Sequence, residues 1–323
     1  MVGILKKMRK PLLQKKHWSM KVVQQKSYSV CWKIIRFLLL FGLSFMILYP
    51  VFVKFSASIK SMSDMMDATV VFIPKHPTLQ NYRIVLDSVK YPVTLLKTVL
   101  FCLLQSFLQL ASCALVAYGI ARFKFRGNKL LFGMAVLTLI IPPQIILLPL
   151  YIRFHFFGIT NIFQFSGVFS GIDLINTYWP FILLSGTALG FKNGLYIYLL
   201  RQHFKNMPMV LEEAAYIDGC GPFKTFVKIM LPGSVPMLVT VFLFSFVWQW
   251  NDTTYSGIFF PEIPTLANKL YGMVFTTMGA GTTLVSAILE SPKFFLLIVP
   301  IVILYLFTQK FFVQSISRSG IVG

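Results

Sequence analysis

The chain has 323 residues, of which 56% are hydrophobic and only 12% are charged, so it lacks the polar surface that a soluble domain of this size needs. Its formal net charge of +20 does not indicate nucleic-acid binding, because the basic residues lie in short tails and loops between long apolar runs and not on one folded face. The four cysteines lack metal-ligand spacing and are expected to be free thiols. The composition therefore predicts an integral membrane protein.

Six stretches are apolar enough to cross a bilayer as helices, which takes about 20 residues each. They are 34–53, 95–121, 130–152, 178–200, 236–258 and 294–313. Gly186, Gly190 and Lys192 interrupt the fourth stretch, which favours a bent helix or a helix with a polar lower half. A seventh piece, 159–169, is too short to span and is expected to lie at the interface or to re-enter the membrane. The predicted fold class is an all-α membrane protein with six transmembrane helices.

Lysine and arginine predict the orientation, because they are enriched in short loops on the cytoplasmic side. Residues 1–36 hold ten of them and no acidic residue, and the loop 122–129 is likewise basic. Both termini are therefore expected in the cytoplasm of a bacterium, with the chain crossing the inner membrane several times. The basic tail 1–33 either enforces this topology or binds anionic lipid or a partner. It precedes a six-span domain, 34–323, which has an external loop at about 57–94 and a cytoplasmic loop at about 201–235.

Ionisable residues deep in a membrane usually mark an ion path or a proton relay, and the expected spans hold almost none. Lys54, Lys97 and Asp252 lie near span ends, where they can reach the interface. This disfavours a self-sufficient secondary transporter. No catalytic or metal-binding set falls at one membrane depth, and the phosphate-binding loop motif of ATPases is absent from the sequence, which disfavours an enzyme. If transport is powered, we expect the energy to come from another chain, and no cofactor is expected on this one.

The cytoplasmic loop 208–232 has the pattern of a short helix between two hinges. Pro208 is suited to open the helix, since proline is tolerated in the first turn. Glu212 and Glu213 then fall in that first turn, where negative charge suits the helix dipole. Gly219 is suited to end it, because glycine accepts a positive φ. Such a segment can be a mechanical lever or an ordinary helix–turn–helix connector.

The same loop resembles the E-A-A-x3-G-x9-I-x-L-P motif of binding-protein-dependent ABC importer permeases. The matching positions are Glu213, Ala214, Ala215, Gly219, Ile229, Leu231 and Pro232, and Glu212 and Asp218 belong to the same segment. Every position matches at the right spacing. The resemblance implies the fold of a type I ABC importer permease, in which this segment is the coupling helix that docks in a cleft of the ATPase.

Further segments are similar to the maltose-type, carbohydrate-uptake branch of these permeases. They are 72–82, 248–252 and 309–313 with the closing 320–323, although the usual C-terminal Lys-Gly is absent and 1–33 lies outside the resemblance. The implied function is translocation of a sugar, expected to be an oligosaccharide. The implied partners are a second homologous permease, two ATPase subunits that bind ATP and magnesium, and an external solute-binding protein. A polyol or glycerol phosphate is the alternative cargo within the family.

Sugars are recognised by aromatic faces and by amide and hydroxyl groups, so polar residues in or beside the spans are the candidates for the substrate path. These are Gln144, Asn176, Trp248, Gln249, Asn251 and Asp252. Each also has an ordinary structural explanation. Tryptophan is enriched at membrane interfaces, Gln144 follows two prolines and could bond carbonyls freed by a kink, and Asp252 could cap the fifth helix.

Overall fold

The computed structural model describes residues 20–158, 171–273 and 281–319. Every named element in these ranges is a helix, and the β pairing described is a single antiparallel bridge between Phe157 and Ile172. The all-α class predicted from the sequence is therefore confirmed. The short apolar piece 159–169, expected at the membrane interface, lies outside the described residues.

The chain divides into two compact units, residues 1–57 and 58–323, and each is considered by itself. Helix α1, Met20–Ser58, makes up the described part of the first unit. Its stretch Tyr28–Ser58 is long and apolar enough to cross a membrane. Pro50 lies inside this helix, as is tolerated in membrane-spanning helices.

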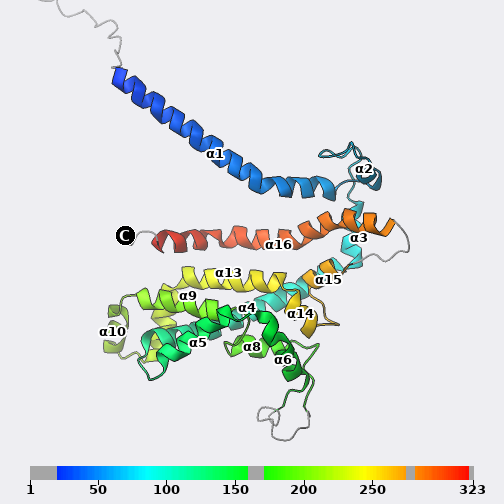
Figure 1. Cartoon of the computed structure of the whole chain (residues 1–323). Coiled ribbons are helices and arrows are strands. Elements are labelled where there is room, and N and C mark those ends of the chain that lie inside the picture. The colour runs from blue at the N-terminus through cyan, green and yellow to red at the C-terminus, as the bar shows by residue number, and fades with distance from the viewer. Residues whose placement is uncertain (1–19, 159–170, 274–280, 320–323) are drawn as a thin grey trace, which may run out of the picture. The chain divides into compact units, whose positions relative to one another are not determined.

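The second unit contains the remaining helices (Figure 1). In chain order they are α2 (Met62–Met66), α3 (Gln80–Ser88), α4 (Tyr91–Arg122), α5 (Asn128–Ile140), α6 (Pro143–His155), α8 (Trp179–Gly186), α9 (Asn193–Asn206), α10 (Val210–Ile217), α11 (Pro222–Thr225), the π-helical turn η1 (Phe226–Met230), α12 (Leu231–Gly233), α13 (Val235–Asn251), α14 (Thr254–Phe259), α15 (Leu266–Gly272) and α16 (Gly281–Ser319). Helix α4 is central, because it packs against α8, α9 and α13, while α5 packs on α9 and α16 on α13. Figure 1 shows α9, α13 and α16 side by side, with α10 at one end of this unit and α3 and α15 at the other.

Proline bends the third expected span. Helices α5 and α6 meet at an angle of 103° across Ile141 and Pro142. Proline has no N–H for the helical ladder and disfavours a helical conformation in the residue before it, and Pro142 and Pro143 stand together here. The sequence alone predicted a span with a kink, and the structure shows a sharp break.

The fourth and fifth expected spans are also interrupted. The fourth consists of α8 and α9, separated by residues 187–192, where the glycines and Lys192 had indicated a bend. The fifth is α13, which the segment Pro222–Gly233 meets at 82°. By length and composition, the described residues contain three helices able to cross a membrane, or up to five if each bent pair is one span. The count of six spans stays a prediction.

Two apolar clusters occupy the second unit, and a polar layer separates them along α4. One cluster contains Phe101 and the other contains Cys113. Between them, Gln105, Gln109 and Ser112 are buried. Their spacing of four and three residues puts all three on one face of the helix. Buried polar side chains inside an apolar helical unit need hydrogen-bond partners, so this layer is a candidate for part of a binding site.

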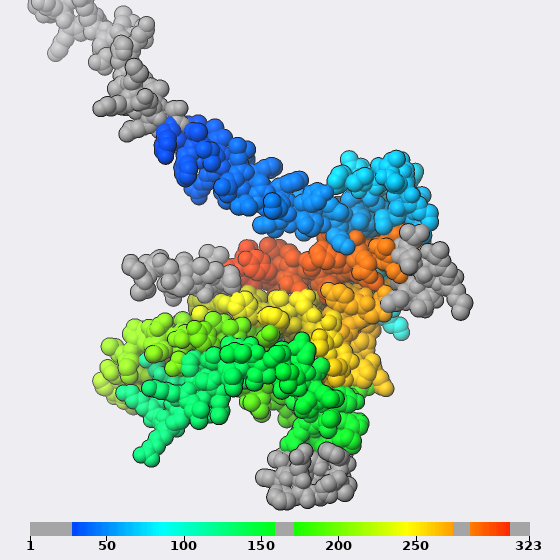
Figure 2. Space-filling model, viewed as in Figure 1, coloured from blue at the N-terminus to red at the C-terminus, as the bar shows by residue number. Residues whose placement is uncertain are grey.

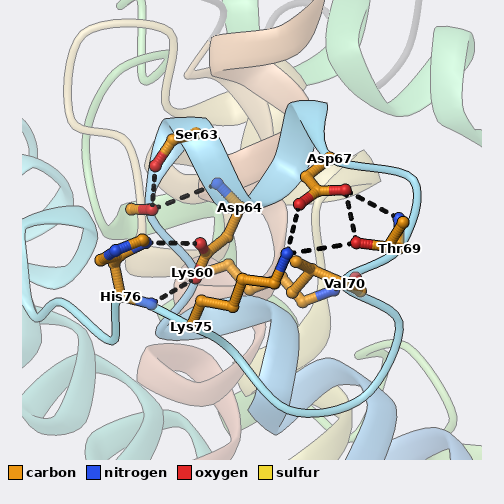
Figure 3. Close-up of polar contacts among 9 residues, drawn as sticks. Lys60, Ser63, Asp64, Asp67, Thr69, Val70, Lys75 and His76 are labelled. Atoms are coloured by element: carbon orange, nitrogen blue, oxygen red, sulfur yellow. Dashed lines mark hydrogen bonds and ion pairs between the residues drawn. The ribbon is translucent and has the colours of Figure 1, made fainter.

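A network of polar contacts fixes segment 58–82 ahead of α4 (Figure 3). The buried Lys60 donates a hydrogen bond of 2.8 Å from Nζ to the carbonyl oxygen of Val70. Asp67 accepts a bond of 2.6 Å from Nζ of Lys75. The sequence predicted an irregular external loop in this part of the chain. The structure shows short helices joined by turns, held by side-chain bonds.

Asp64 is the buried centre of this network, with 2% of its side chain exposed. Its carboxylate accepts bonds from the backbone N–H of His76 at 2.8 Å and from Nδ1 of the His76 ring at 3.1 Å. Burial opposes ionisation of Asp64, but the bonds from His76 outweigh it, so the pKa of this carboxyl lies below its ordinary value of 3.8. Ionised Asp64 therefore stabilises the folded segment.

Asp64→Asn is expected to speed backbone amide exchange in residues 60–78 several-fold near neutral pH, because the amide replaces an ionised acceptor. A carboxyl whose pKa is lowered by folding stabilises the fold above its unfolded pKa, and this stabilisation is lost as pH falls through the folded pKa. The difference between variant and wild type should therefore disappear well below pH 3.8. Hydrogen–deuterium exchange across this pH range is the measurement. Asp87→Asn, an exposed acid on α3, is the control, and an equal effect there would contradict the prediction.

Candidate functional site: a loop helix and a pocket among the helices

The loop with the family motif forms the short helix α10, followed by a tight turn and the chain of α11, η1 and α12. Helix α10 begins at Val210, two residues after the proline that was expected to open it. Glu212 and Glu213 lie in its first turn, as predicted. Gly219 has φ +77° just after the helix, which is the left-handed conformation that ends helices. In Figures 1 and 2 this loop forms the left end of the second unit.

The motif residues do not share one surface. Glu213 and Ala214 are exposed, whereas Glu212 and Ala215 are buried against the rest of the unit. The buried pair is three residues apart and so lies on one side of the helix. The sequence prediction assigned all four residues to contact with a partner, and the structure divides them into an outer and an inner set. Asp218, Gly219 and Pro232 are exposed, and Ile229 and Leu231 are half-buried.

Exposed apolar side chains cover the outer side of this loop. Val210 is 68% exposed, Ile217 86% and Phe223 70%. They belong to a polar and charged loop and not to a membrane span, so an aqueous surface is their expected setting. Apolar side chains gathered on such a surface are typical of a protein–protein contact.

The inner side of α10 meets the end of α4. Glu212 Oε1 lies 3.0 Å from Nε of Arg122, and each side chain is only 6% exposed. Arg122 also donates a hydrogen bond of 2.8 Å from Nη2 to the carbonyl oxygen of Met207, just before α10. The loop helix is therefore fixed to a long helix of the same chain.

A second candidate site is a pocket of about 290 Å³ between α4, α6, α9 and α13. Five of the six residues proposed for the substrate path line it, namely Gln144, Trp248, Gln249, Asn251 and Asp252. The sixth, Asn176, is not a lining residue. Its side chain donates to Glu262 at 2.7 Å and accepts from the Glu262 backbone at 3.1 Å.

The polar layer of α4 forms part of the pocket wall. Gln109 donates to Asn193 Oδ1 at 2.9 Å and to the carbonyl oxygen of Phe191 at 3.1 Å, and it accepts from the hydroxyl of Ser245. Gln105 and Gln249 are also buried, but Oε1 of Gln105 and Nε2 of Gln249 have no hydrogen-bond partner in the structure. A buried polar atom without a partner is costly, so these two amides are suited to bond a polar ligand or water.

Trp248 supplies a half-exposed aromatic surface in the pocket. The ammonium group of Lys192 lies 4.5 Å from the centre of this ring, a cation–π contact. Asp252 has a structural role in addition, because it accepts bonds from the backbone N–H groups of Tyr255 and Ser256. Asp252 also ends the fifth helix, as the cap interpretation allowed, because it directly follows α13 and its backbone N–H donates to the carbonyl oxygen of Gln249.

The sequence reasoning missed several lining residues. They are Gln105, Gln109, Pro143, Leu147, Phe191, Lys192, Tyr196, Ser245, Thr253, Thr254 and Tyr255. A signal existed for the two glutamines, because polar residues at helical spacing inside an apolar span indicate a polar face. Among the described residues, no group of three or more His, Cys, Asp or Glu side chains could hold a metal ion.

Helices long and apolar enough to cross a membrane, a loop helix with an exposed apolar face and a polar pocket define a helical membrane transport component. Comparison of the sequence with known protein families identifies the family to which this membrane component belongs. The chain belongs to the family of binding-protein-dependent transport system inner membrane components, whose pattern matches residues 113–318. This region contains the loop motif and most of the pocket.

Several characterised relatives are sugar permeases. The galactooligosaccharides transport system permease protein GanQ of Bacillus subtilis is 28% identical over 295 residues, covering 89% of this chain and 94% of GanQ. The trehalose transport system permease protein SugB of Mycobacterium tuberculosis is 31% identical over 205 residues, covering 64% of this chain and 68% of SugB.

The fold matches a solved importer. In the crystal structure of a bacterial ABC transporter involved in the import of the acidic polysaccharide alginate, one chain matches with a TM-score of 0.68 at 18% identity. The match covers 88% of this chain and 98% of that chain. The expected fold of an ABC importer permease is thereby confirmed.

Proposed function

We propose that this chain is the permease subunit of an ATP-driven importer that carries a sugar, and specifically an oligosaccharide, across the cytoplasmic membrane. The observation that supports this most directly is the complete E-A-A-x3-G-x9-I-x-L-P spacing on an exposed loop helix of a chain from this family. The oligosaccharide cargo is proposed from the relatives, since GanQ is named for galactooligosaccharides and SugB for trehalose.

In this proposal α10 is a coupling helix. Its outer set, with Glu213 and Ala214, faces a cleft in an ATPase subunit, and the exposed apolar side chains of Val210, Ile217 and Phe223 supply the contact area. ATP and magnesium bind to the two ATPase subunits and not to this chain. A second, homologous permease completes the membrane pathway, and an external solute-binding protein delivers the sugar. The excess of lysine and arginine in the tail and short loops supports a cytoplasmic location for both termini.

The pocket is proposed as part of the sugar path. Amides without partners suit sugar hydroxyls, which both donate and accept hydrogen bonds, and the Trp248 ring offers an apolar face for a sugar ring to stack on. A volume of about 290 Å³ is close to the lower end for small-molecule sites, so the pocket is suited to a short part of a sugar chain and not to a long oligosaccharide at once. A change of the permease between two conformations would then move the sugar from one part of the path to the next.

The function is tested by purifying the complex that the chain forms in its own host and reconstituting it in lipid vesicles. An ATPase and a second permease are expected to co-purify. Sugar uptake should require ATP and the solute-binding protein, and oligosaccharides presented by that protein should stimulate ATP hydrolysis. If polyols or glycerol phosphate stimulate ATP hydrolysis and oligosaccharides do not, the cargo is one of those solutes and not an oligosaccharide. Uptake by the isolated chain without an ATPase would contradict the proposal.

A further inference from the structure

Arg122 and Glu212 form a buried ion pair between two elements that are 90 positions apart in the sequence. Arg122 is the last residue of α4, and Glu212 lies in the first turn of α10. Their 3.0 Å contact and 6% exposure mean that both charges have left water. Removing one partner of such a pair leaves the other charge buried without compensation. Arg122 Nε and Glu212 Oε1 lack hydrogen-bond geometry, so the pair is an ionic contact, and its main consequence is the cost of losing either partner.

The same arginine holds the chain on both sides of the start of α10. Its Nη2 donates to the carbonyl oxygen of Met207, and its Nε faces Glu212 five residues later. A guanidinium has several N–H donors in one rigid plane, so one side chain can make both contacts at once. A lysine could not hold both in the same geometry.

Aromatic packing encloses this contact. Tyr118, one turn before Arg122 on α4, packs against Phe204 of α9 and Phe226 of η1, with ring centres 5.7 Å and 4.8 Å apart. Phe204 precedes α10 in the chain and Phe226 follows it. The last turn of α4 is thus packed against the elements on either side of the loop helix and is in ionic contact with the helix itself.

Helix α4 connects this contact directly to the pocket. It is a single helix from Tyr91 to Arg122 whose one proline lies in its first turn. Gln109 in the pocket wall is 13 residues before Arg122, which corresponds to about 20 Å of helix at 1.5 Å per residue. The α13 route is bent by 82° where Pro222–Gly233 meets it, and the α5–α6 route is bent by 103°. Two unbent helices therefore connect the pocket to the loop helix: α9 continues into it through residues 207–209 of the chain, and α4 reaches it through the Arg122–Glu212 contact.

We infer that the Arg122–Glu212 pair is the joint through which movement of α10 is transmitted to α4 and so to the pocket. Glu212 and Arg122 are positioning residues here and touch neither ATP nor sugar. The inference rests on the proposed function, because it assigns a path for the force that an ATPase applies to α10. It also gives the two neighbouring glutamates different tasks: Glu213 faces the partner, and Glu212 ties α10 to its own chain.

The test uses the reconstituted complex with Glu212→Gln, Arg122→Gln and the charge exchange Arg122→Glu with Glu212→Arg. Each single variant should keep its ATPase subunits bound but lose about tenfold or more of ATP-driven sugar uptake, a size typical of coupling between sites. Its ATP hydrolysis should no longer respond to the sugar-loaded binding protein. The exchange should recover part of both, because it restores the ion pair but not the bond to Met207. Single variants that transport like the wild type, or an assembled exchange variant no better than the single variants, would overturn the inference.

Two further variants serve as a fallback and as a control. If Arg122→Gln does not reach the membrane, Arg122→Lys replaces it in the test. Lysine keeps the positive charge but loses the bond to Met207, so partial sugar uptake is expected. Full uptake by Arg122→Lys would contradict the inference about the Arg122–Glu212 pair. Glu213→Gln is the matched control, because the exposed neighbour should weaken binding of the ATPase subunits instead. A wild-type complex that does not import sugar would refute the proposed function. Normal uptake by both the wild type and the joint variants would refute the joint alone.

Discussion

Gly219→Val is expected to abolish ATP-driven sugar uptake while the protein stays in the membrane at normal amounts. Gly219 has φ +77°, and a Cβ added there meets nothing within 4 Å, so the substitution causes no collision inside the chain. Its effect comes from the backbone, since the left-handed conformation costs an L-residue about 1–2 kcal/mol and is a genuine outlier for a β-branched one. The turn after α10 would therefore relax to another conformation and change how α10 meets the ATPase.

Gly221→Val is the matched control for this prediction. Gly221 is two residues away and equally open, but its φ of −75° and ψ of 167° are an extended conformation that valine adopts readily. It also precedes Pro222, which favours the same extended region. Uptake should remain close to the wild-type rate. Uptake and membrane levels in vesicles are the measurements, and survival of transport in Gly219→Val would show that the turn is not part of the lever.

Much of the loop could be predicted because its determinants are local. The two acids in the first turn and the glycine after the last turn follow from rules that involve neighbours in the chain, and the structure has both features. Burial of Glu212 beside exposed Glu213 could not be predicted in the same way. Consecutive helical residues point about 100° apart, and which of them faces inward depends on where α4 ends. Its partner, Arg122, is far away in the sequence and looked like a topology signal.

The pocket was only partly predictable for a related reason. Polar residues after Pro143 and near Trp248 stood out because they interrupt apolar spans, and the structure brings them together. Their meeting depends on the 103° break between α5 and α6, and the prolines there indicate a break without specifying its angle. Asn176 resembled the others in chemistry, but the fold uses it to bind Glu262. Residue type indicated the kind of chemistry, and only the packing decided which residues share a cavity.

Replacing both unpaired amides, Gln105→Leu with Gln249→Leu, is expected to lower ATP-driven sugar uptake by about tenfold to a hundredfold. Each lost bond to a sugar hydroxyl removes about 0.5–1.5 kcal/mol. Neither side chain belongs to the loop, so ATPase binding and the affinity of the solute-binding protein for sugar should not change. Initial uptake rates at saturating binding protein measure the effect. Thr240→Val is the control, because within the described part of the chain this buried hydroxyl on α13 bonds to its own helix, at Pro236, and Thr240 is not a lining residue.

The double variant should transport less sugar without becoming less stable. Oε1 of Gln105 and Nε2 of Gln249 are buried without partners, and replacing such groups by apolar ones of similar shape is neutral or stabilising. The thermal unfolding midpoint of the purified complex is therefore expected to stay the same or rise while uptake falls. Residues kept at a cost to stability are typical of a functional site. A double variant that unfolds at lower temperature and still transports at the wild-type rate would show that the two amides support the fold and do not contact the cargo.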